Sequence, residues 1–516
     1  MELFQWILAL LVGAVALTAL ARRINAPYPS LLALGGVALA LLPTAPKFAL
    51  DPELTLVLFV APVLLDAAFD TSMRDLRANW IPVTSLVIAA VGITTAAVAW
   101  TAHALVPDMP WPAAIALGAI VAPPDAAAAT AVLKQLRLPH RLLVILEGES
   151  LLNDASALMI YRIAVLAVVS GGLDMETMLP LSLLSIVGSV IAGHLLGSLY
   201  LRLAMRVTDV PSSIVLQFAG TFCVWILADH LGLSAIVTVV VYAITLARKA
   251  PRVTAARMRI PSYAVWDLVV FVLNVLAFVL IGLQLRPILG PLNMRERFDY
   301  FTVAAVVLGI VIVARFVWVF SYAAVARLKR RWLGPGRWPG ASKPSVSASL
   351  VVSWCGMRGI VTLAAAYALP IGFPHRDLIL LTAFCVVVGT LVAQGLTLRP
   401  LIVALQLQDD GSVDEEVKMA YERIVRVGLA QLDGDESQAA QTIRRELESQ
   451  LAEGGGVHRE REALGQYGSL RASIVAAQRD TLIEMRANGD IGDDAFHQVE
   501  AQLDVAELNA VGAEYP

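Results

Sequence analysis

Charged residues are scarce in this chain of 516 residues, where Asp, Glu, Lys and Arg together account for 16% of positions. Soluble domains contain about 25% of these residues. Hydrophobic residues reach 58%, against roughly 45–50% in an ordinary globular protein. This composition excludes a single soluble domain and indicates a protein that crosses a membrane many times.

Cysteine is also rare, since the chain has only Cys223, Cys355 and Cys385, each inside an apolar segment. Their placement predicts neither a disulfide framework nor a metal cluster. The first residues, MELFQWILALLVGAVALTALARR, carry their positive charges after the apolar run, whereas a cleavable signal peptide has them before it. We therefore expect this segment to be the first membrane span.

Thirteen apolar segments are long enough to cross a hydrocarbon core about 30 Å thick. They are predicted at residues 3–20, 29–45, 53–69, 80–104, 111–133, 141–169, 179–205, 212–229, 233–247, 263–285, 300–326, 345–369 and 377–405. Alternate loops hold 20 Lys and Arg against 5 in the opposite set, and basic loops stay in the cytoplasm. We expect a multi-pass plasma (inner) membrane protein with its N-terminus outside and its C-terminal tail in the cytoplasm.

The composition changes near residue 408. Residues 1–407 form the predicted transmembrane domain, and from Asp409 onwards the chain has 10 Lys and Arg against 23 Asp and Glu. Helical stretches are expected at 413–432, 437–453, 457–487 and 491–511, with glycine-containing breaks between them. Residues 408–516 are thus predicted to be a cytoplasmic acidic helical tail. We favour a solvated appendage that aids assembly or regulation over a ligand-sensing domain.

Four acidic residues interrupt the apolar sequence between residues 121 and 165: Asp125, Glu147, Glu149 and Asp154. A carboxylate at the centre of a membrane helix costs about 2.5–3.5 kcal/mol on insertion scales, so such acids are usually functional. The simplest explanation is that they bind a small cation or a proton. Glu147 lies near the predicted cytoplasmic end of its span, where a pore-mouth charge and an interfacial residue explain it equally well.

Two spans contain signals for a broken helix. Pro123 and Pro124 stand directly before Asp125 in mid-span, and proline removes a backbone donor and clashes with the preceding turn. The sequence Gly-Met-Arg-Gly around Arg358 predicts a second break, in which the guanidinium compensates the carbonyl end of a half-helix. Half-helix ends at mid-membrane are a recurrent feature of transporters.

The span at 141–169 places polar groups one helical turn apart. Ser150 and Asp154 are four residues apart, as are Glu149 and Asn153, so each pair shares a helix face. Carboxylate, hydroxyl and amide oxygens together form a hard-oxygen environment that suits sodium or lithium.

Five strings occur in order along the chain: APPDA, LEGESLLNDA, FVLNVLAFVLIGLQL, SWCGMRGIV and GTLVAQGLTL. They resemble the sodium/proton antiporters of the NhaP and NHE type, in the monovalent cation:proton antiporter-1 family, over most of residues 50–405. The resemblance implies an all-α polytopic fold with about 13 transmembrane helices in two inverted repeats, in which spans 5 and 12 are broken and cross. It also implies a homodimer formed by other spans, and it does not cover the tail.

Carried over to this chain, the resemblance makes Asp154 the carboxylate that takes either sodium or a proton. Asn153 stands beside it, and Asp125 stabilises the unwound segment. Ser150 matches the family's ligand one turn before the aspartate. Asp66, where relatives often carry Glu, is expected to be a further sodium ligand or the partner of a nearby polar group.

The family usually has Thr-Asp where this chain has Pro124-Asp125, so only the Pro124 carbonyl can contribute at that position. Glu149 matches a buried acid that pairs with an arginine. Arg315 is the expected partner and Arg358 is the alternative.

The implied function is secondary antiport of sodium, or lithium, against protons by competition at Asp154, with electroneutral stoichiometry and no ATP. We expect no enzyme activity, no cofactor apart from the transported ions and no nucleic-acid partner. Potassium/proton exchange is the nearest alternative. A cation channel, or a membrane sensor that signals through the tail, is an alternative of another class, since paired acids also suit a cation pore.

Overall fold

The computed structural model describes residues 2–43, 51–133, 138–170, 175–254, 256–333, 345–407, 409–434 and 437–452, with Leu136 and four single positions between 478 and 488. Within these ranges the chain is helical and contains no strand, as predicted. It divides into two compact units, Met1–Asp409 and Asp410–Pro516, each described here by itself.

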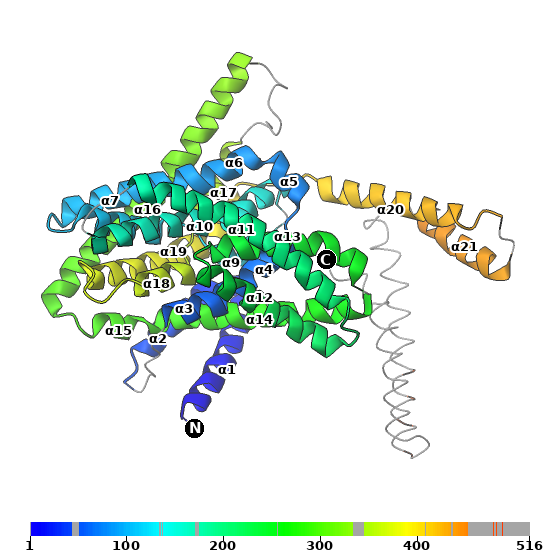
Figure 1. Ribbon diagram of the computed structural model, residues 1–516, viewed down its shortest axis with the longest axis horizontal. Coiled ribbons are helices and arrows are strands. Elements are labelled where there is room, and N and C mark those ends of the chain that lie inside the picture. Colours follow the sequence, from blue (N-terminus) through cyan, green and yellow to red (C-terminus); the bar gives the residue numbers. More distant parts are fainter. Residues whose placement is uncertain are drawn as a thin grey trace. The chain divides into compact units, whose positions relative to one another are not determined.

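The first unit is a bundle of apolar helices (Figure 1). Nine helical segments of the described residues are long and apolar enough to cross a membrane. They consist of α1 (Glu2–Arg23), α3–η1–α4 (Pro52–Thr55, Leu56–Val60, Ala61–Asp70), α6–η2–α7 (Trp80–Thr84, Ser85–Ala90, Val91–Leu105), α10 (His140–Ser170), α11 (Met175–Ala204), α12 (Val210–His230), α14–α15 (Ala256–Leu283, Leu285–Leu289), α16 (Met294–Leu333) and α19 (Arg376–Ala404).

Four more segments complete the bundle. They are α2 (Tyr28–Ala40), α13 (Ala235–Val253) and two pairs of short helices, α8 with α9 (Trp111–Val121, Ala126–Leu133) and α17 with α18 (Val346–Trp354, Ile360–Tyr367). The described segments therefore number thirteen and follow the predicted order. Short α5 (Met73–Ala78) lies between α4 and α6.

Local hydrogen bonding modifies two of the spans. The π-helical turn η1 ends two residues before Pro62, whose missing N–H prevents a regular α-helical bond there. In η2, the Val87 carbonyl accepts a hydrogen bond from the Ser156 hydroxyl at 2.6 Å. This contact ties the third and fourth long segments, α6–η2–α7 and α10, together.

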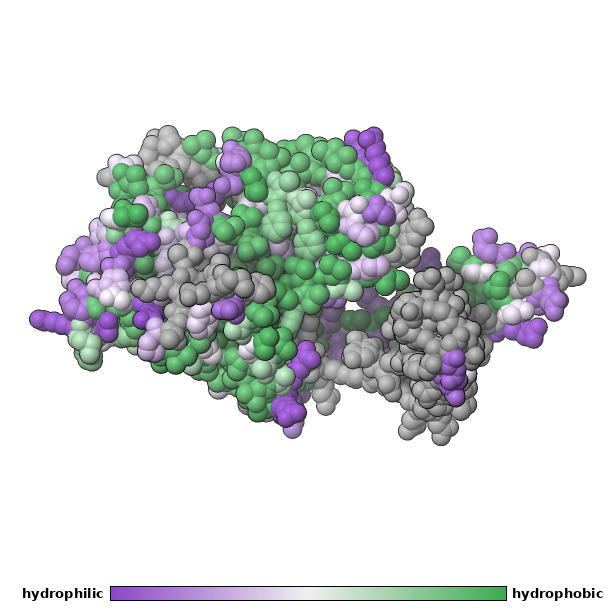
Figure 2. Space-filling model, turned by 90° about the horizontal axis from the view of Figure 1, so that it is seen from below, coloured by the Kyte–Doolittle hydropathy of each residue, from purple (hydrophilic) through white to green (hydrophobic). Residues whose placement is uncertain are grey.

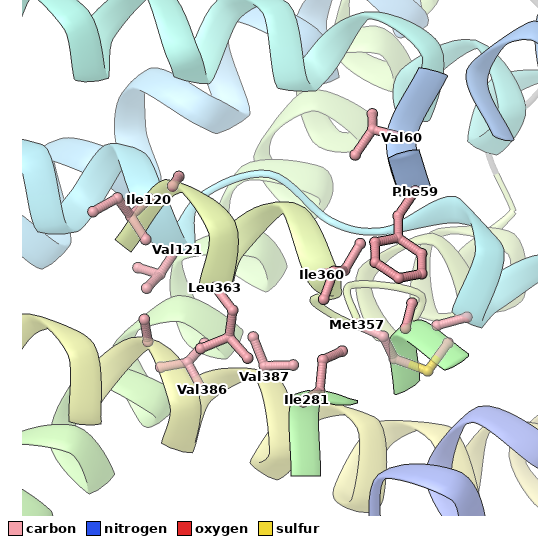
Figure 3. Packing of buried hydrophobic residues seen from close by; sticks show 14 of the residues in the cluster. Phe59, Val60, Ile120, Val121, Ile281, Met357, Ile360, Leu363, Val386 and Val387 are labelled. Carbon is pink, nitrogen blue, oxygen red and sulfur yellow. The ribbon is translucent and has the colours of Figure 1, made fainter. Parts of the chain in front are cut away.

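The core lies where the short helices meet α19. Ile120, Val121, Ile360 and Leu363 pack with Val386 and other buried residues there (Figure 3). Small residues allow close approach of backbones elsewhere, since a side chain at Gly118 of α8 would collide with the Thr95 backbone of α7. The short helices are thus fixed by packing on several sides.

Hydrophobic residues also cover a broad part of the face of the first unit shown in Figure 2. On α11 the outward residues include Leu181, Leu184, Val187, Ile191 and Leu195, all exposed. A helix that is apolar on its outer side suits lipid, in which no water is available for the chain. The unit is therefore a multi-pass membrane protein.

The second unit contains two described helices, α20 (Ser412–Ala430) and α21 (Gln438–Ala452), which pack on each other. Arg444 donates to the Leu432 carbonyl at 2.8 Å, and a Cβ at Gly428 would lie 3.3 Å from the Leu447 side chain. These helices agree with the predictions at 413–432 and 437–453. The stretches predicted at 457–487 and 491–511 lie outside the described residues, apart from single positions.

Candidate ion-binding site

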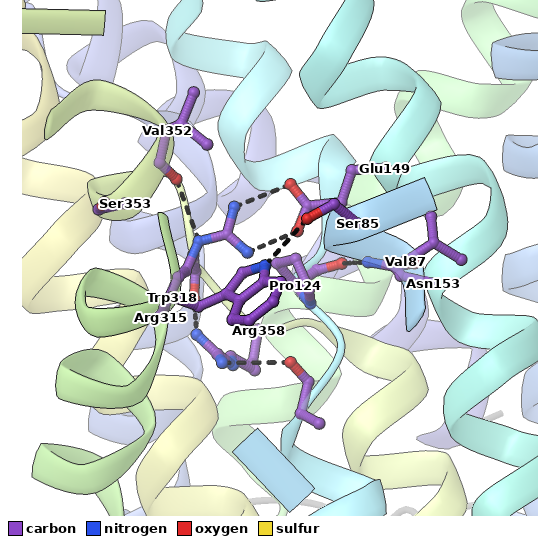
Figure 4. Close-up of polar contacts among 12 residues, drawn as sticks. Ser85, Val87, Pro124, Glu149, Asn153, Arg315, Trp318, Val352, Ser353 and Arg358 are labelled. Carbon is purple, nitrogen blue, oxygen red and sulfur yellow. Dashed lines mark hydrogen bonds and ion pairs between the residues drawn. The ribbon is translucent and has the colours of Figure 1, made fainter. Parts of the chain in front are cut away.

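The break between α8 and α9 leaves backbone carbonyls without helical partners. Pro123 and Pro124 follow the last turn of α8 and have no N–H to donate. The Asn153 side-chain nitrogen on α10 donates to the Pro124 carbonyl at 2.8 Å, in a fully buried contact (Figure 4). The predicted break is present, and Asn153 binds the backbone it frees.

Arg358 lies in the break between α17 and α18 and is 1% exposed. Its guanidinium donates to the carbonyls of Val121, at 2.9 Å, and Ala122, at 3.2 Å, at the end of α8, and also to the Gly356 carbonyl. The Arg358 N–H donates to the Thr390 hydroxyl of α19 at 3.0 Å. A cation therefore sits at the negative, C-terminal end of a half-helix, where it stabilises the helix dipole.

The two breaks cross in direct backbone contact. The Asp125 N–H donates to the Met357 carbonyl at 2.6 Å. The Asp125 carboxylate lies so close to Gly359 that a Cβ there would collide with it. Asp125 precedes the first residue of α9 and Gly359 caps α18, so the acid stands at the positive ends of two half-helices.

Glu149 and Arg315 form a buried ion pair across α10 and α16. Arg315 donates to the two carboxylate oxygens at 2.5 and 2.8 Å, and its Nε donates to the Val352 carbonyl in the last turn of α17 at 3.0 Å (Figure 4). Of the two arginines considered for Glu149, Arg315 makes the contact. Arg315 thus stabilises the C-terminal end of α17 as Arg358 stabilises that of α8.

A cavity of about 60 Å³ lies beside the first break and brings several predicted residues together. Its wall includes Pro124 and Asp125 from the break and Ser150 and Glu149 from α10. Glu147, which is exposed, also lines it, so the cavity reaches the protein surface. Thr130, Cys355 and apolar side chains complete the wall.

Asp154 is half-buried on α10, next to the fully buried Asn153. It lies within electrostatic range of Asp125, so the two carboxylates repel each other when both are ionised. The Asn153 Oδ1 atom is buried and accepts no hydrogen bond from the described residues. The pair Asn153–Asp154 therefore offers a buried amide oxygen beside a carboxylate.

Asp66 is not brought to the same cavity as Ser150. It lines a larger cavity of about 560 Å³ among α4, α11, α12, α13 and α14, together with Asp70 and Asp267. Gln217 of α12 holds one wall by accepting from Trp266 at 2.7 Å and donating to Ser262 at 3.2 Å. No three His, Cys, Asp or Glu side chains in the described ranges gather into a metal-binding group.

The buried polar groups of α19 were not predicted from the sequence. Gln394 is fully buried, and neither end of its amide has a hydrogen-bond partner among the described residues. It lies one turn after Thr390, the acceptor for the Arg358 N–H. The signal was present, because Gln394 is the amide side chain in the otherwise largely apolar string GTLVAQGLTL.

This geometry agrees with comparisons to known proteins. Residues 7–404 match the sodium/hydrogen exchanger transmembrane family, and the chain belongs to that family of membrane antiporters. An uncharacterized Na+/H+ exchanger of Mycobacterium tuberculosis is 31% identical over 97% of this chain and 95% of its own length. The family assignment made from the five strings is confirmed.

Two further relatives extend the comparison. A sodium, potassium, lithium and rubidium/H+ antiporter of Bacillus pumilus is 30% identical over 84% of this chain and 66% of its own length. The solved sodium proton antiporter MjNhaP1 of Methanocaldococcus jannaschii has a TM-score of 0.61, at 20% identity, over 79% of this chain and 99% of its own. At that identity the structural match supports the fold, including the all-helical architecture.

Proposed function

We propose that this chain exchanges sodium, or lithium, for protons, and that the two compete for Asp154. The observation that carries the proposal is the crossing of two broken helices beside the Asn153–Asp154 pair, held by the contact between Asp125 and Met357. The crossing leaves helix ends and polar oxygens inside an apolar bundle, as transporters of small ions require.

In this proposal Asp154 and Ser150 bind the cation, and Asp66 joins them from the side of the larger cavity. Asp125 and the Pro124 carbonyl line the smaller cavity, on the other side of the proposed site. Glu149 acts as a structural partner of Arg315, because both groups are buried and saturated by each other. Arg358 compensates the broken helix.

One carboxylate that takes either one sodium ion or one proton gives exchange when the site opens alternately to each side. A one-for-one exchange moves no net charge, so we propose electroneutral transport. We place the protein in the plasma membrane. The distribution of basic loops then orients the N-terminus to the outside and the acidic tail to the cytoplasm. The functional unit is proposed to be a homodimer.

Potassium/proton exchange is the second candidate, and two observations favour it. The Bacillus pumilus relative is named as an antiporter of sodium, potassium, lithium and rubidium. Pro124 stands where the family usually has threonine, which removes a hydroxyl ligand and favours the same wider choice of ions.

The test is cation-driven proton movement in proteoliposomes that contain the full chain and a pH-sensitive dye. We expect saturable exchange with sodium and lithium, unchanged by an imposed membrane potential, and none for Asp154→Asn. Asp229→Asn, in an exposed ion pair with Arg162, is the control and should exchange normally. Conductance without counter-flow would show a channel, and exchange by Asp154→Asn would refute the role of Asp154.

A further inference from the structure

The first unit has two separate cavities, and the residues that line each of them border loops on the same predicted face. Residues near the end of α4, the end of α11 and the start of α14 line the larger cavity. These helix ends border loops that are predicted to be cytoplasmic. The smaller cavity lies between the end of α9 and the first half of α10, beside another such loop. The lining residues of the two cavities do not overlap.

Their sizes suit different occupants. At about 60 Å³ the small cavity has room for about two waters, since a water takes ~30 Å³ in the liquid. A sodium ion that keeps its first water shell needs several times that space. The cavity of about 560 Å³ is large enough for a hydrated ion.

The polar groups of the small cavity are those that a proton relay uses. Exposed Glu147 stands at the surface, Thr130 offers a hydroxyl, and Ser150 and Asp125 lie at the inner end. Asp125 is within electrostatic range of Asp154, which lies on the same helix as Ser150. Carboxyl, hydroxyl and water groups in sequence can pass a proton between them.

The other ionisable groups around this cavity do not interrupt such a route. Glu149 of α10 is held by Arg315 of α16, and Cys355 from the second break is buried. The remaining lining residues, including Leu133, Leu143 and Leu146, are apolar and exclude competing polar paths.

We propose that protons and cations use separate routes on this face. A proton displaced from Asp154 leaves through the small cavity, by way of Asp125, Ser150, waters and Glu147, while the hydrated cation enters through the large cavity past Asp66. This proposal depends on the proposed antiport and deepens it. The transfer needs no co-reactant, because the proton passes from the carboxyl group to water and then to the solvent.

The separation has a kinetic advantage. When sodium approaches Asp154 and the proton leaves at the same time, a single narrow route would have to hold both cations and would suffer their mutual repulsion. Two routes remove that conflict. Glu147 and Thr130 are then positioning residues for proton transfer, although neither binds sodium.

The test uses proteoliposomes of the full chain, with the rate normalised to inserted protein and measured over a range of sodium concentrations and pH, in H2O and D2O. Glu147→Gln should lower the maximal rate at least several-fold, increase the solvent isotope effect and leave the apparent KM for sodium within twofold of wild type. Glu147→Asp should restore most of the rate, and Thr130→Val should give a smaller loss of the same kind.

Asp267→Asn is the matched control, since Asp267 is an acid that lines the large cavity. It should raise the apparent KM for sodium and leave the isotope effect unchanged. Wild-type rate and isotope effect in both Glu147→Gln and Thr130→Val, or a change of KM alone, would overturn separate routes while leaving antiport intact. A wild-type chain without exchange would instead refute the proposed function.

Discussion

The breaks between α8 and α9 and between α17 and α18 interrupt two helices at one crossing, but with different residues. The first uses Pro123 and Pro124, which cannot donate, and places an acid at the start of α9. The second uses flanking glycines and an arginine. Each break supplies the charge that the other needs, because Arg358 binds the end of α8 while Asp125 lies against Gly359 at the start of α18.

The two breaks therefore form one electrostatic unit. The C-terminal ends of α8 and α17 each bind one guanidinium group, that of Arg358 at α8 and that of Arg315 at α17. The negative groups differ in their use. Both carboxylate oxygens of Glu149 are bound by Arg315, whereas Asp125 borders the smaller cavity.

The largest effect is expected from Glu149→Gln, which removes the ion pair with Arg315, the arginine bound to the end of α17. It leaves the Arg315 guanidinium buried without its counter-charge, and loss of one partner of such a pair costs about 3–5 kcal/mol. Thermal unfolding of the purified protein in detergent should show a much lower melting temperature and yield.

The matched control for that variant is Asp229→Asn, since the Arg162–Asp229 pair is more than half exposed. An exposed pair contributes about 0–1 kcal/mol, so this variant should melt near wild type. If Glu149→Gln had normal thermal stability but no transport, Glu149 would belong with Asp125 as a transport residue.

Gly359→Ala tests the close approach of the two breaks. The added methyl group would collide with the Asp125 carboxylate, so the acid or the start of α18 must move. Overpacking of this kind costs about 1–3 kcal/mol, and we expect exchange to be lost in proteoliposomes. Gly309→Ala in α16 meets no atom within 4 Å and should transport normally. Equal transport by both variants would show that the crossing tolerates separation.

Comparing Gln394→Leu with Thr390→Val tests which buried polar groups of α19 stabilise the second break. Replacing an amide that has no partner in the described part of the chain by an apolar side chain should leave stability unchanged or raise it. Thr390→Val, by contrast, deprives the buried Arg358 N–H of its acceptor and should cost about 1–3 kcal/mol. The melting temperatures of the two variants are compared. An equal decrease in both would mean that the Gln394 amide has a bound partner such as water.

The smallest effect concerns a contact outside the crossing, at the start of α10. Burial alone would raise the pKa of Asp75, but hydrogen bonds with Arg74, His140 and Ser72 outweigh it and lower that pKa. Because the pKa of Asp75 is lower in the folded protein, its ionised side chain stabilises the fold at pH values above the ordinary pKa of about 4. This stabilisation is lost as the pH falls through the lowered pKa.

Asp75→Asn should therefore lower the free energy of unfolding at pH 7 by less than about 1 kcal/mol. We expect a correspondingly small decrease of the melting temperature. The difference from wild type should disappear on acidification below the lowered pKa. A gap of constant size across this pH range would assign the effect to packing instead of charge.

Much of this arrangement follows from local sequence signals. Hydropathy located the thirteen segments, and Pro123–Pro124 and the glycines beside Arg358 located both breaks. Each signal acts within a few residues, so one sequence suffices to read it. The helix α16 extends beyond the predicted 300–326 because its charged ends continue the helix past the apolar part.

Other features depend on distant contacts. Glu149 and Arg315 are 166 positions apart, and the collision that requires glycine at 359 involves Asp125. Asp66 faces the larger cavity because of the rotation of α4 about its axis, which hydropathy does not determine for a segment with apolar residues on most sides.

The most direct test of competition at Asp154 is the apparent KM for sodium measured from pH 6 to 9 in proteoliposomes of the full chain. If one carboxylate holds either ion, KM should rise by about tenfold for each unit of acidification in the acid range, with an unchanged maximal rate. A KM independent of pH, with only the maximal rate changing, would contradict the account.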